Sequence, residues 1–270
     1  MNSIKAAIEG QASTCLYRNA ANNQTTQIAD LQYFIAQKVD VIILVASVDT
    51  GWDSVLGEAK DAGIPVVLVD RNVTTDADNY TTYIASDFAN EGKQVAIALG
   101  EKISSGEVVE IEGTNGASSA TLRKEGFDGE LEQNYPNLNI IDSHDCRFTR
   151  SDAESYLDTA YFSAHPNVRA IFAHNDDMAL GVIAAIKAVG KTPGTDIVVV
   201  SVDAIKEALQ AVFDGKLYYT YECSPLLGAL TVEICNKAAA GIALEKRYSP
   251  TEQGFRKADL TQDFIDARSY

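Results

Sequence analysis

The chain has 270 residues, a formal net charge of −16 and 46% hydrophobic residues. This length suits one large domain or two of ordinary size, and no apolar run approaches the length of a transmembrane helix. Lys and Arg are scattered through an acidic chain, which argues against nucleic acid and anionic membrane surfaces as partners.

The start of the chain and its cysteines carry little sign of secretion or metal binding. Residues 1–25 lack the basic start, apolar stretch and cleavage site of a signal peptide. Cys15, Cys146, Cys223 and Cys235 are too far apart for a disulfide framework or a CxxC site. We expect buried free thiols rather than a single disulfide.

Strand-like and helix-like segments alternate along the chain, beginning with a helical pattern at 2–10 whose stop is Gly10. Continuous apolar runs rich in β-branched residues predict strands covered on both faces. Trp52 recurs with apolar residues at helical spacing, which favours a core position over a cleft. Ser224 and Pro225 predict the start of a late helix. The expected strands are 13–19, 39–47, 64–70, 81–87, 106–113, 137–143, 169–175, 196–203 and 216–223.

Strands separated by helices of this length predict the doubly wound parallel α/β class, because parallel strands need crossover connections. About ten strands fit two sheets of about five better than one wide sheet. No polar linker interrupts the pattern, so strand-like crossings are expected to join two lobes.

Polar residues end the predicted strands with unusual regularity. Ligands of open parallel sheets bind at the carboxyl ends of the strands. Each acidic residue there could instead be an ordinary helix N-cap. Together they favour a neutral polyhydroxylated ligand, because carboxylates accept from hydroxyls and Arg donates to ring or vicinal oxygens. The set is Asp70, Arg71, Asp87, Asn175, Asp176, Asp177, Asp203 and Glu222, with Arg123 and Arg150 available from other loops.

Other chemistries fit less well. GTNGAS at 113–118 lacks the spacing of a phosphate loop and is expected to be a turn. His174 has no second metal ligand placed by spacing, so a packed, hydrogen-bonded histidine is favoured over a metal site. No nucleophile elbow or Ser/His/Asp set is present. We therefore expect no catalytic residue, metal or cofactor.

Several segments together resemble the type I periplasmic sugar-binding proteins of bacterial ABC importers. They are VDR at 69–71, IASD at 84–87, RKEGF at 123–127, AHNDDMALG at 173–181 and VSVD at 200–203. FIAQKVDVIIL, TGWDSVLGEAKDAGIPVVLVDR and DCRFTRSDA look more narrowly like the galactofuranose-binding branch. The resemblance covers residues 1–270.

The resemblance implies two Rossmann-like lobes that close by a hinge around a monosaccharide and deliver it to a membrane permease. The first lobe would comprise 1–86 and 224–251, and the second 87–223 and 252–270. Hinges are expected near 86–88, 222–224 and 251–253. Carried over by position, the sugar contacts would be Asp70, Arg71, Asp87, Arg123, Phe148, Arg150, Asn175, Asp203 and Glu222. Phe148 would offer its ring face to sugar C–H groups, and Asp176 fits either a ligand contact or a helix cap.

The resemblance also implies a difference at the front of the chain. Family members begin with a strand that lies inside the first sheet, between the segments expected here at 13–19 and 40–46. We therefore expect an inner strand to be absent, with Met1 as an internal start. The full-length protein would be a periplasmic or membrane-tethered extracellular monomer. The alternatives are the effector-sensing core of a LacI-type transcription regulator and an α/β enzyme acting on a sugar or nucleotide.

Overall fold

The chain folds into two units, and each unit is built from separate stretches of the sequence. The computed structural model describes residues 2–9, 11 and 14–270. Unit 1 extends to Ser86 and adds Gly116–Ser118 and Pro225–Pro250, and unit 2 holds the remainder. Compared with the expected division, Ser224 and Thr251 lie in unit 2 and the short 116–118 segment lies in unit 1. Among the described residues, no helix combines the length and apolar character that crossing a membrane requires.

Unit 1 contains a four-stranded parallel sheet in the order β1-β2-β3-β9. Its core joins Val67 and Ile84 of the sheet to Ile4 of α1 and Ile234 of α10. Trp52 is fully buried, as its helical spacing predicts, and its Nε1 donates to the Val48 carbonyl at 2.8 Å. The elements are α1 (Asn2–Glu9), α2 (Gln24–Ala36), β1 (Ile42–Leu44), α3 (Asp53–Asp61), β2 (Val66–Val69), β3 (Thr82–Ile84), α10 (Gly228–Ala239) and β9 (Arg247–Tyr248), with a 3-10 turn at Ala77–Asn79.

The strand expected at 13–19 is wrong for its described part. Residues 14–20 carry no strand assignment, and β1 forms the edge of the sheet. A cavity of about 580 Å³ is lined by both Leu16 and Ile43 and by Ile8 of α1. An apolar segment becomes a strand only when a neighbour satisfies its backbone groups, and here the cavity lies along that edge. Gly10, the expected stop of the first helix, lies outside the described residues.

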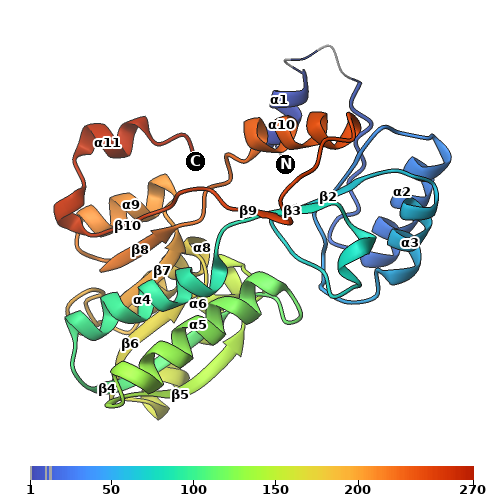
Figure 1. Cartoon of the computed structure of the whole chain (residues 1–270). Coiled ribbons are helices and arrows are strands. Elements are labelled where there is room, and N and C mark those ends of the chain that lie inside the picture. Colours follow the sequence, from blue (N-terminus) through green and yellow to red (C-terminus); the bar gives the residue numbers. More distant parts are fainter. Residues whose placement is uncertain (1, 10, 12–13) are drawn as a thin grey trace. The chain divides into compact units, whose positions relative to one another are not determined.

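Unit 2 contains a six-stranded sheet in the order β10-β8-β7-β6-β4-β5, parallel except for the short β10 (Figure 1). The strands are β4 (Gly106–Glu112), β5 (Leu138–Asp145), β6 (Val168–Ala173), β7 (Val198–Asp203), β8 (Tyr219–Glu222) and β10 (Gly254–Phe255). The helices are α4 (Phe88–Lys102), α5 (Ser118–Asn134), α6 (Arg150–Tyr156), α7 (Thr159–Ala164), α8 (Asp176–Ala188), α9 (Lys206–Phe213) and α11 (Gln262–Ala267), with a 3-10 turn at Lys257–Asp259.

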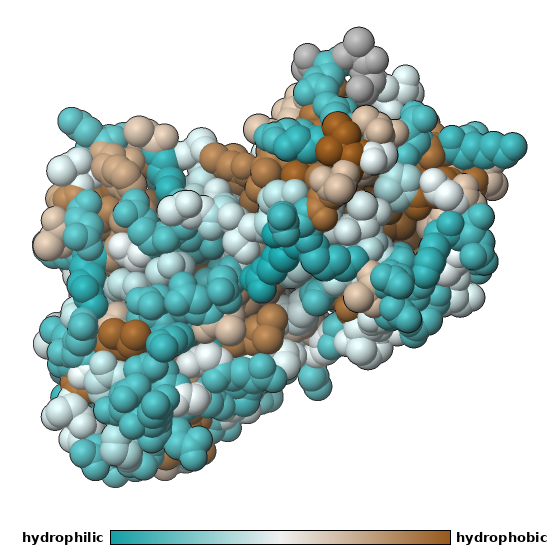
Figure 2. All heavy atoms as spheres, in the orientation of Figure 1, coloured by the Kyte–Doolittle hydropathy of each residue, from teal (hydrophilic) through white to brown (hydrophobic). Residues whose placement is uncertain are grey.

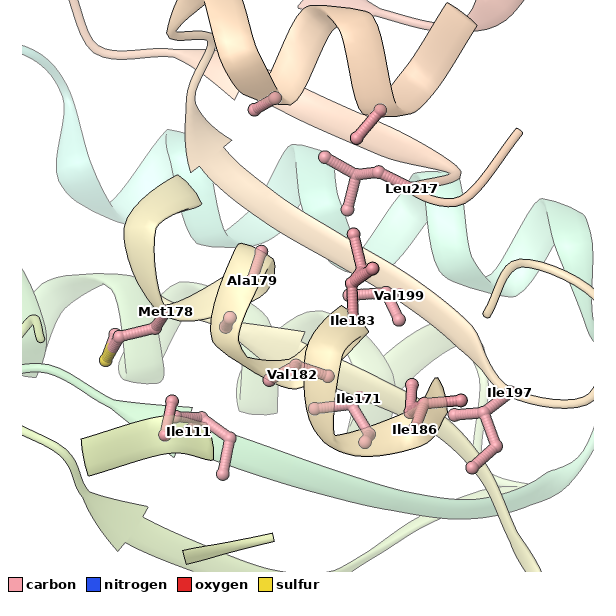
Figure 3. Close-up of a cluster of buried hydrophobic side chains, with 14 of the residues drawn as sticks. Ile111, Ile171, Met178, Ala179, Val182, Ile183, Ile186, Ile197, Val199 and Leu217 are labelled. Atoms are coloured by element: carbon pink, nitrogen blue, oxygen red, sulfur yellow. The ribbon is translucent and has the colours of Figure 1, made fainter. Parts of the chain in front are cut away.

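Helix α8 supplies much of the core of unit 2. Asn175 caps it by accepting from the Met178 amide at 3.0 Å. Figure 3 shows its side chains, including Val182 and Ile186, directed toward Ile171 of β6. Each such fully buried aliphatic side chain contributes about 1.5–3 kcal/mol. This burial explains why α8 is almost entirely apolar.

Three further expectations have clear outcomes. GTNGAS forms a turn, as expected. Helix α10 begins at Gly228 after Leu227, so the start predicted from Ser224 and Pro225 is wrong; the Ser224 amide instead donates to Glu252 Oε1 at 2.7 Å. All four cysteines are free, as expected, but only Cys146 is buried.

On the face in Figure 2, hydrophobic side chains form small groups among hydrophilic ones.

Candidate functional site at the carboxyl ends of the strands

Asp70 and Arg71 follow β2 in unit 1 and face a cavity of about 260 Å³. Asp70 has a left-handed backbone, with φ of 69°, and its carbonyl accepts from the Tyr83 hydroxyl at 3.0 Å. Arg71 Nη1 donates to the Ser47 carbonyl at 3.0 Å. The Asp70 side chain is 47% exposed, and its Oδ2 lies 3.9 Å from Arg71 Nε.

The same cavity is lined by polar residues that the sequence did not single out, among them Arg18, Asn19 and Asp30. Gln27, also at its wall, donates to the Val45 carbonyl at 2.7 Å and accepts from the Ser47 amide at 2.9 Å. The Gln27 side chain thus bonds one backbone carbonyl and one backbone amide in the segment that follows β1. Asn19 ends the segment expected as a strand at 13–19, but that segment forms no strand, and Gln27 and Asp30 lie within helix α2. Only their place around this cavity brings these residues together.

In unit 2, three predicted residues lie at the ends of adjacent strands. Asn175 follows β6, Asp203 ends β7, and Glu222 ends β8, where it is the register partner of Asp203. Glu222 Oε1 accepts from the Tyr270 hydroxyl at 2.6 Å and pairs with Arg268 at 2.7 Å. Carboxyl ends of parallel strands share one edge, so the sheet brings these three acceptors together.

Arg123 joins this group from helix α5 rather than from a loop, which corrects its expected placement. Its Nε donates to Glu91 at 2.7 Å, Nη1 donates to the His174 carbonyl at 2.6 Å, and Nη2 lies 3.5 Å from Asp203. The neighbouring Glu91 and Asp203 carboxylates raise the pKa of Arg123 despite its burial. The guanidinium is therefore a fixed buried cation beside the strand ends.

Phe148 is held beside the sheet by backbone geometry. Arg147 and Phe148 are both left-handed, with φ of 55° and 59°. A Cβ atom at Gly113 would lie 2.0 Å from the Phe148 ring, so only glycine at 113 leaves room for it. The Phe148 carbonyl lies 3.5 Å from Asn175 Nδ2. The ring position thus depends on GTNGAS, a segment whose sequence indicated only a turn.

Arg150 and Asp87 have structural partners in unit 2. Arg150 begins α6, not a loop, and donates to Asp177 at 2.8 Å and to Glu207 at 2.8 and 3.0 Å. These hydrogen bonds raise the pKa of Arg150. Asp87 caps α4 by accepting from the Asn90 amide at 3.2 Å. Sequence reasoning left cap and ligand roles open for Asp87; the structure shows a cap contact through Oδ1, and the ligand role stays a prediction.

Two residues of the AHNDDM segment lie inside the fold. Asp176 is completely buried, and Asn175, not Asp176, caps α8, so neither role expected for Asp176 fits. Burial raises the pKa of Asp176 to about 7, although three donors to its carboxylate oppose the shift. His174 is also fully buried and lies 2.8 Å from Glu110, which confirms a packed, hydrogen-bonded histidine.

One group in the described part of the chain has metal-ligand chemistry. The ligand atoms of Glu91, Cys223 and Glu252 lie within 4.8 Å of one another. Glu91, however, is already paired with Arg123 at 2.7 Å. A buried guanidinium at that distance supplies the positive charge that a metal ion would otherwise bring.

A family comparison agrees with this arrangement of strands and polar ends. The periplasmic binding protein domain family matches residues 1–243. The chain belongs to this family. Among curated periplasmic binding proteins, the galactofuranose-binding protein YtfQ of Escherichia coli is 33% identical over 272 residues, covering 99% of this chain and 85% of the relative. The ribose import binding protein RbsB of Bacillus subtilis is 30% identical, covering 92% and 80%.

Solved periplasmic binding proteins have the same fold, so the parallel two-unit α/β class predicted from the sequence is confirmed. A Mycobacterium smegmatis protein in complex with β-D-fucofuranose is 41% identical, with a TM-score of 0.91 over 95% of this chain and 86% of its own. The arabinose-transporter binding protein of Shewanella sp. ANA-3, bound to L-arabinofuranose, is 36% identical, with a TM-score of 0.93 over 99% and 89%.

Proposed function

We propose that this protein binds a monosaccharide in its furanose form and delivers it to the permease of an ABC importer. The observation that carries the proposal is the group of Asn175, Asp203 and Glu222 at adjacent strand ends beside Arg123. Such a group offers acceptors to hydroxyls and a fixed cation to ring oxygens, and it contains no nucleophile with a general base. It supports binding rather than catalysis.

Similar proteins support the choice of a furanose. One relative and one similar structure are named for galactofuranose, and two similar structures hold fucofuranose and arabinofuranose. Five-membered rings differ from pyranoses in where their hydroxyls and exocyclic carbons lie, and a site that pairs each hydroxyl discriminates strongly between such forms. We propose that Asp70, Arg71, Asp87, Arg123, Phe148, Arg150, Asn175, Asp203 and Glu222 contribute the contacts.

Titration calorimetry tests the binding proposal. D-galactose, L-arabinose, D-fucose, D-ribose and D-fructose would each be titrated into the protein, with sucrose as a control of the wrong size. We expect one of the monosaccharides to bind with one site per chain. Absence of binding by every monosaccharide would refute the proposal, and turnover of a bound sugar would replace it with an enzyme.

The ring form is tested separately with the sugar that binds. In the carbon-13 spectrum of the bound sugar labelled at C1, furanose and pyranose anomeric carbons give separate signals. We expect the bound signal to be furanose although the free sugar is mainly pyranose. A bound pyranose signal would leave sugar binding intact and exclude the furanose part of the proposal.

A further inference from the structure

The backbone turn that follows β7 is strained and lies directly at a proposed ligand residue. Asp203 has φ of 122° and Ala204 has φ of 56°. Two successive non-glycine residues in this region are rare, because the Cβ atom crowds the backbone. Such a turn persists only when its surroundings hold it.

Backbone atoms of the turn have partners on three separate elements. The Ala204 amide donates to Thr220 Oγ1 of β8 at 3.1 Å, and the Ala204 carbonyl accepts from Arg268 Nε at 2.9 Å. The next amide, that of Ile205, donates to Asp176 Oδ2 at 2.8 Å. Helix α8, strand β8 and the C-terminal segment therefore all fix one short turn.

Asp176 links these partners to one another. Its Oδ1 accepts from Ser201 Oγ of β7 at 2.5 Å and from Thr220 Oγ1 at 2.8 Å, while Oδ2 accepts from Ile205. Its side chain is 0% exposed. Both oxygens are occupied within the fold, so a ligand cannot reach them. The carboxylate instead connects the start of α8 to β7, β8 and the turn.

We propose that Asp176 is a positioning residue for sugar binding, which holds the strained Asp203–Ala204 turn so that the Asp203 carboxylate is presented to the ligand. This inference rests on the proposed function and deepens it, because it assigns a role in sugar binding to a buried side chain that touches no sugar. The same turn places Asp203 3.5 Å from Arg123, so loss of the turn would move Asp203 relative to this fixed cation.

Asp176→Asn is the sharpest variant because it changes shape little. The amide nitrogen cannot accept, so either the Ile205 amide or the two hydroxyls must give up their acceptor. If the nitrogen faces the hydroxyls, Thr220 Oγ1 has to accept from it as well as from Ala204. Either arrangement changes the hydrogen bonds that hold the turn, without leaving a cavity.

Asp142→Asn is the matched control. Asp142 Oδ2 also accepts from two hydroxyls, those of Tyr156 and Tyr161, at 2.5 and 2.8 Å. Asp142 lies on β5, a strand at the edge of the sheet, whereas the proposed ligand residues Asn175, Asp203 and Glu222 lie at the ends of β6, β7 and β8. Asp142→Asn therefore makes the same carboxylate-to-amide change at a residue that has no contact with the turn.

A double-mutant cycle with Asp203→Asn tests the inference by calorimetry on the sugar that the wild type binds. We expect Asp176→Asn to weaken binding by about tenfold or more, and Asp142→Asn to leave it unchanged. Because Asp176 acts through Asp203, the double variant should bind about as weakly as Asp203→Asn alone. Wild-type affinity in Asp176→Asn, or losses that multiply in the double variant, would overturn the inference.

Two further variants keep the test decisive if Asp176→Asn does not fold. Thr220→Val removes the hydroxyl that joins Ala204 to Asp176, whereas Thr220→Ser keeps it. We expect Thr220→Val to weaken binding and Thr220→Ser to retain it, and equal affinities would contradict the inference. Failure of the wild type to bind any sugar would instead refute the proposed function.

Discussion

The two ring nitrogens of His174 have different partners inside unit 2. Nδ1 accepts from the Gly113 amide at 3.3 Å, and Nε2 lies 2.8 Å from Glu110. Only a neutral ring protonated at Nε2 satisfies both contacts. Burial, with the nearby Arg123, lowers the pKa of His174 against the opposing effect of Glu110 and Glu112. The neutral histidine thus bonds both the Gly113 amide and the buried Glu110 carboxylate.

This neutral histidine predicts a loss of stability on acidification. The unfolded chain takes up a proton near the usual His pKa of about 6.5, whereas the native ring resists it, so stability falls as the pH falls. Urea unfolding of the wild type should give a free energy about 1 kcal/mol lower at pH 5.5 than at pH 7 from this group. His174→Gln should remove that difference.

The control for this prediction is His144→Gln. His144 is exposed and stacks on Tyr156, with ring centroids 3.7 Å apart. Its replacement removes a histidine that lies outside the buried pair with Glu110, so it shows what loss of a histidine alone does to the pH dependence. Burial also raises the pKa of Asp128 to about 6, in the same interval. Only the difference between wild type and variant therefore reports on His174, and equal slopes in the two would contradict the prediction.

At the scale of elements, helices α4 and α5 approach each other through two glycines. A Cβ atom at Gly92 of α4 would lie 1.9 Å from the Arg123 carbonyl of α5, and one at Gly126 of α5 would lie 2.0 Å from the Ala89 carbonyl of α4. The contact is reciprocal, with each helix backbone meeting a glycine of the other. This close approach places Arg123 beside Glu91, since Glu91 precedes Gly92 directly.

Gly126→Ala should therefore destabilise unit 2 by about 1–3 kcal/mol, because the methyl group forces the two backbones apart. Gly129→Ala in the same helix has no neighbour within 4 Å of the new Cβ. It should stabilise by roughly 0.5–1 kcal/mol, because alanine loses less backbone entropy in a helix. Thermal unfolding of both variants measures the change in stability, which should be negative for Gly126→Ala and positive for Gly129→Ala. Two changes of the same sign would count against the close approach of the helices.

Strand β1 forms one edge of the unit 1 sheet. STCLYRN has a strand-like composition, yet its described residues form no strand, and a cavity separates them from β1. Strand propensity reflects packing and pairing more than an intrinsic backbone preference. Composition could indicate that the segment suits a sheet, but it could not supply the neighbour.

At the scale of the whole molecule, the chain crosses between its units after Ser86, Ser224 and Pro250, and it also enters unit 1 briefly at Gly116–Ser118. Several crossings restrict two units more than one flexible linker does, so a hinge motion is expected to be coordinated among them. A ligand shifts such a motion only by binding one arrangement more tightly than the other.

Small-angle scattering measures this motion directly. The radius of gyration should decrease when the sugar that binds in calorimetry is added to saturation, because the closed form is more compact. A monosaccharide that does not bind serves as the control and should leave the curve unchanged. An unchanged radius in the presence of a bound sugar would exclude closure while leaving binding intact.

The sequence by itself determined the parallel α/β class, the alternation of strands and helices and the polar residues at the strand ends. These follow from local hydrophobic periodicity and from the rule that parallel strands end at a common edge. Family motifs added Phe148, whose position depends on Gly113.

Only the tertiary structure decided what each polar residue contacts. It placed Asp176 inside the fold, gave Arg123 its buried partner Glu91, gave Glu222 its partners Arg268 and Tyr270, and left residues 14–20 outside any strand. Burial and pairing depend on residues far apart in the chain. A local pattern cannot distinguish a carboxylate that faces a ligand from one that holds the backbone beneath it.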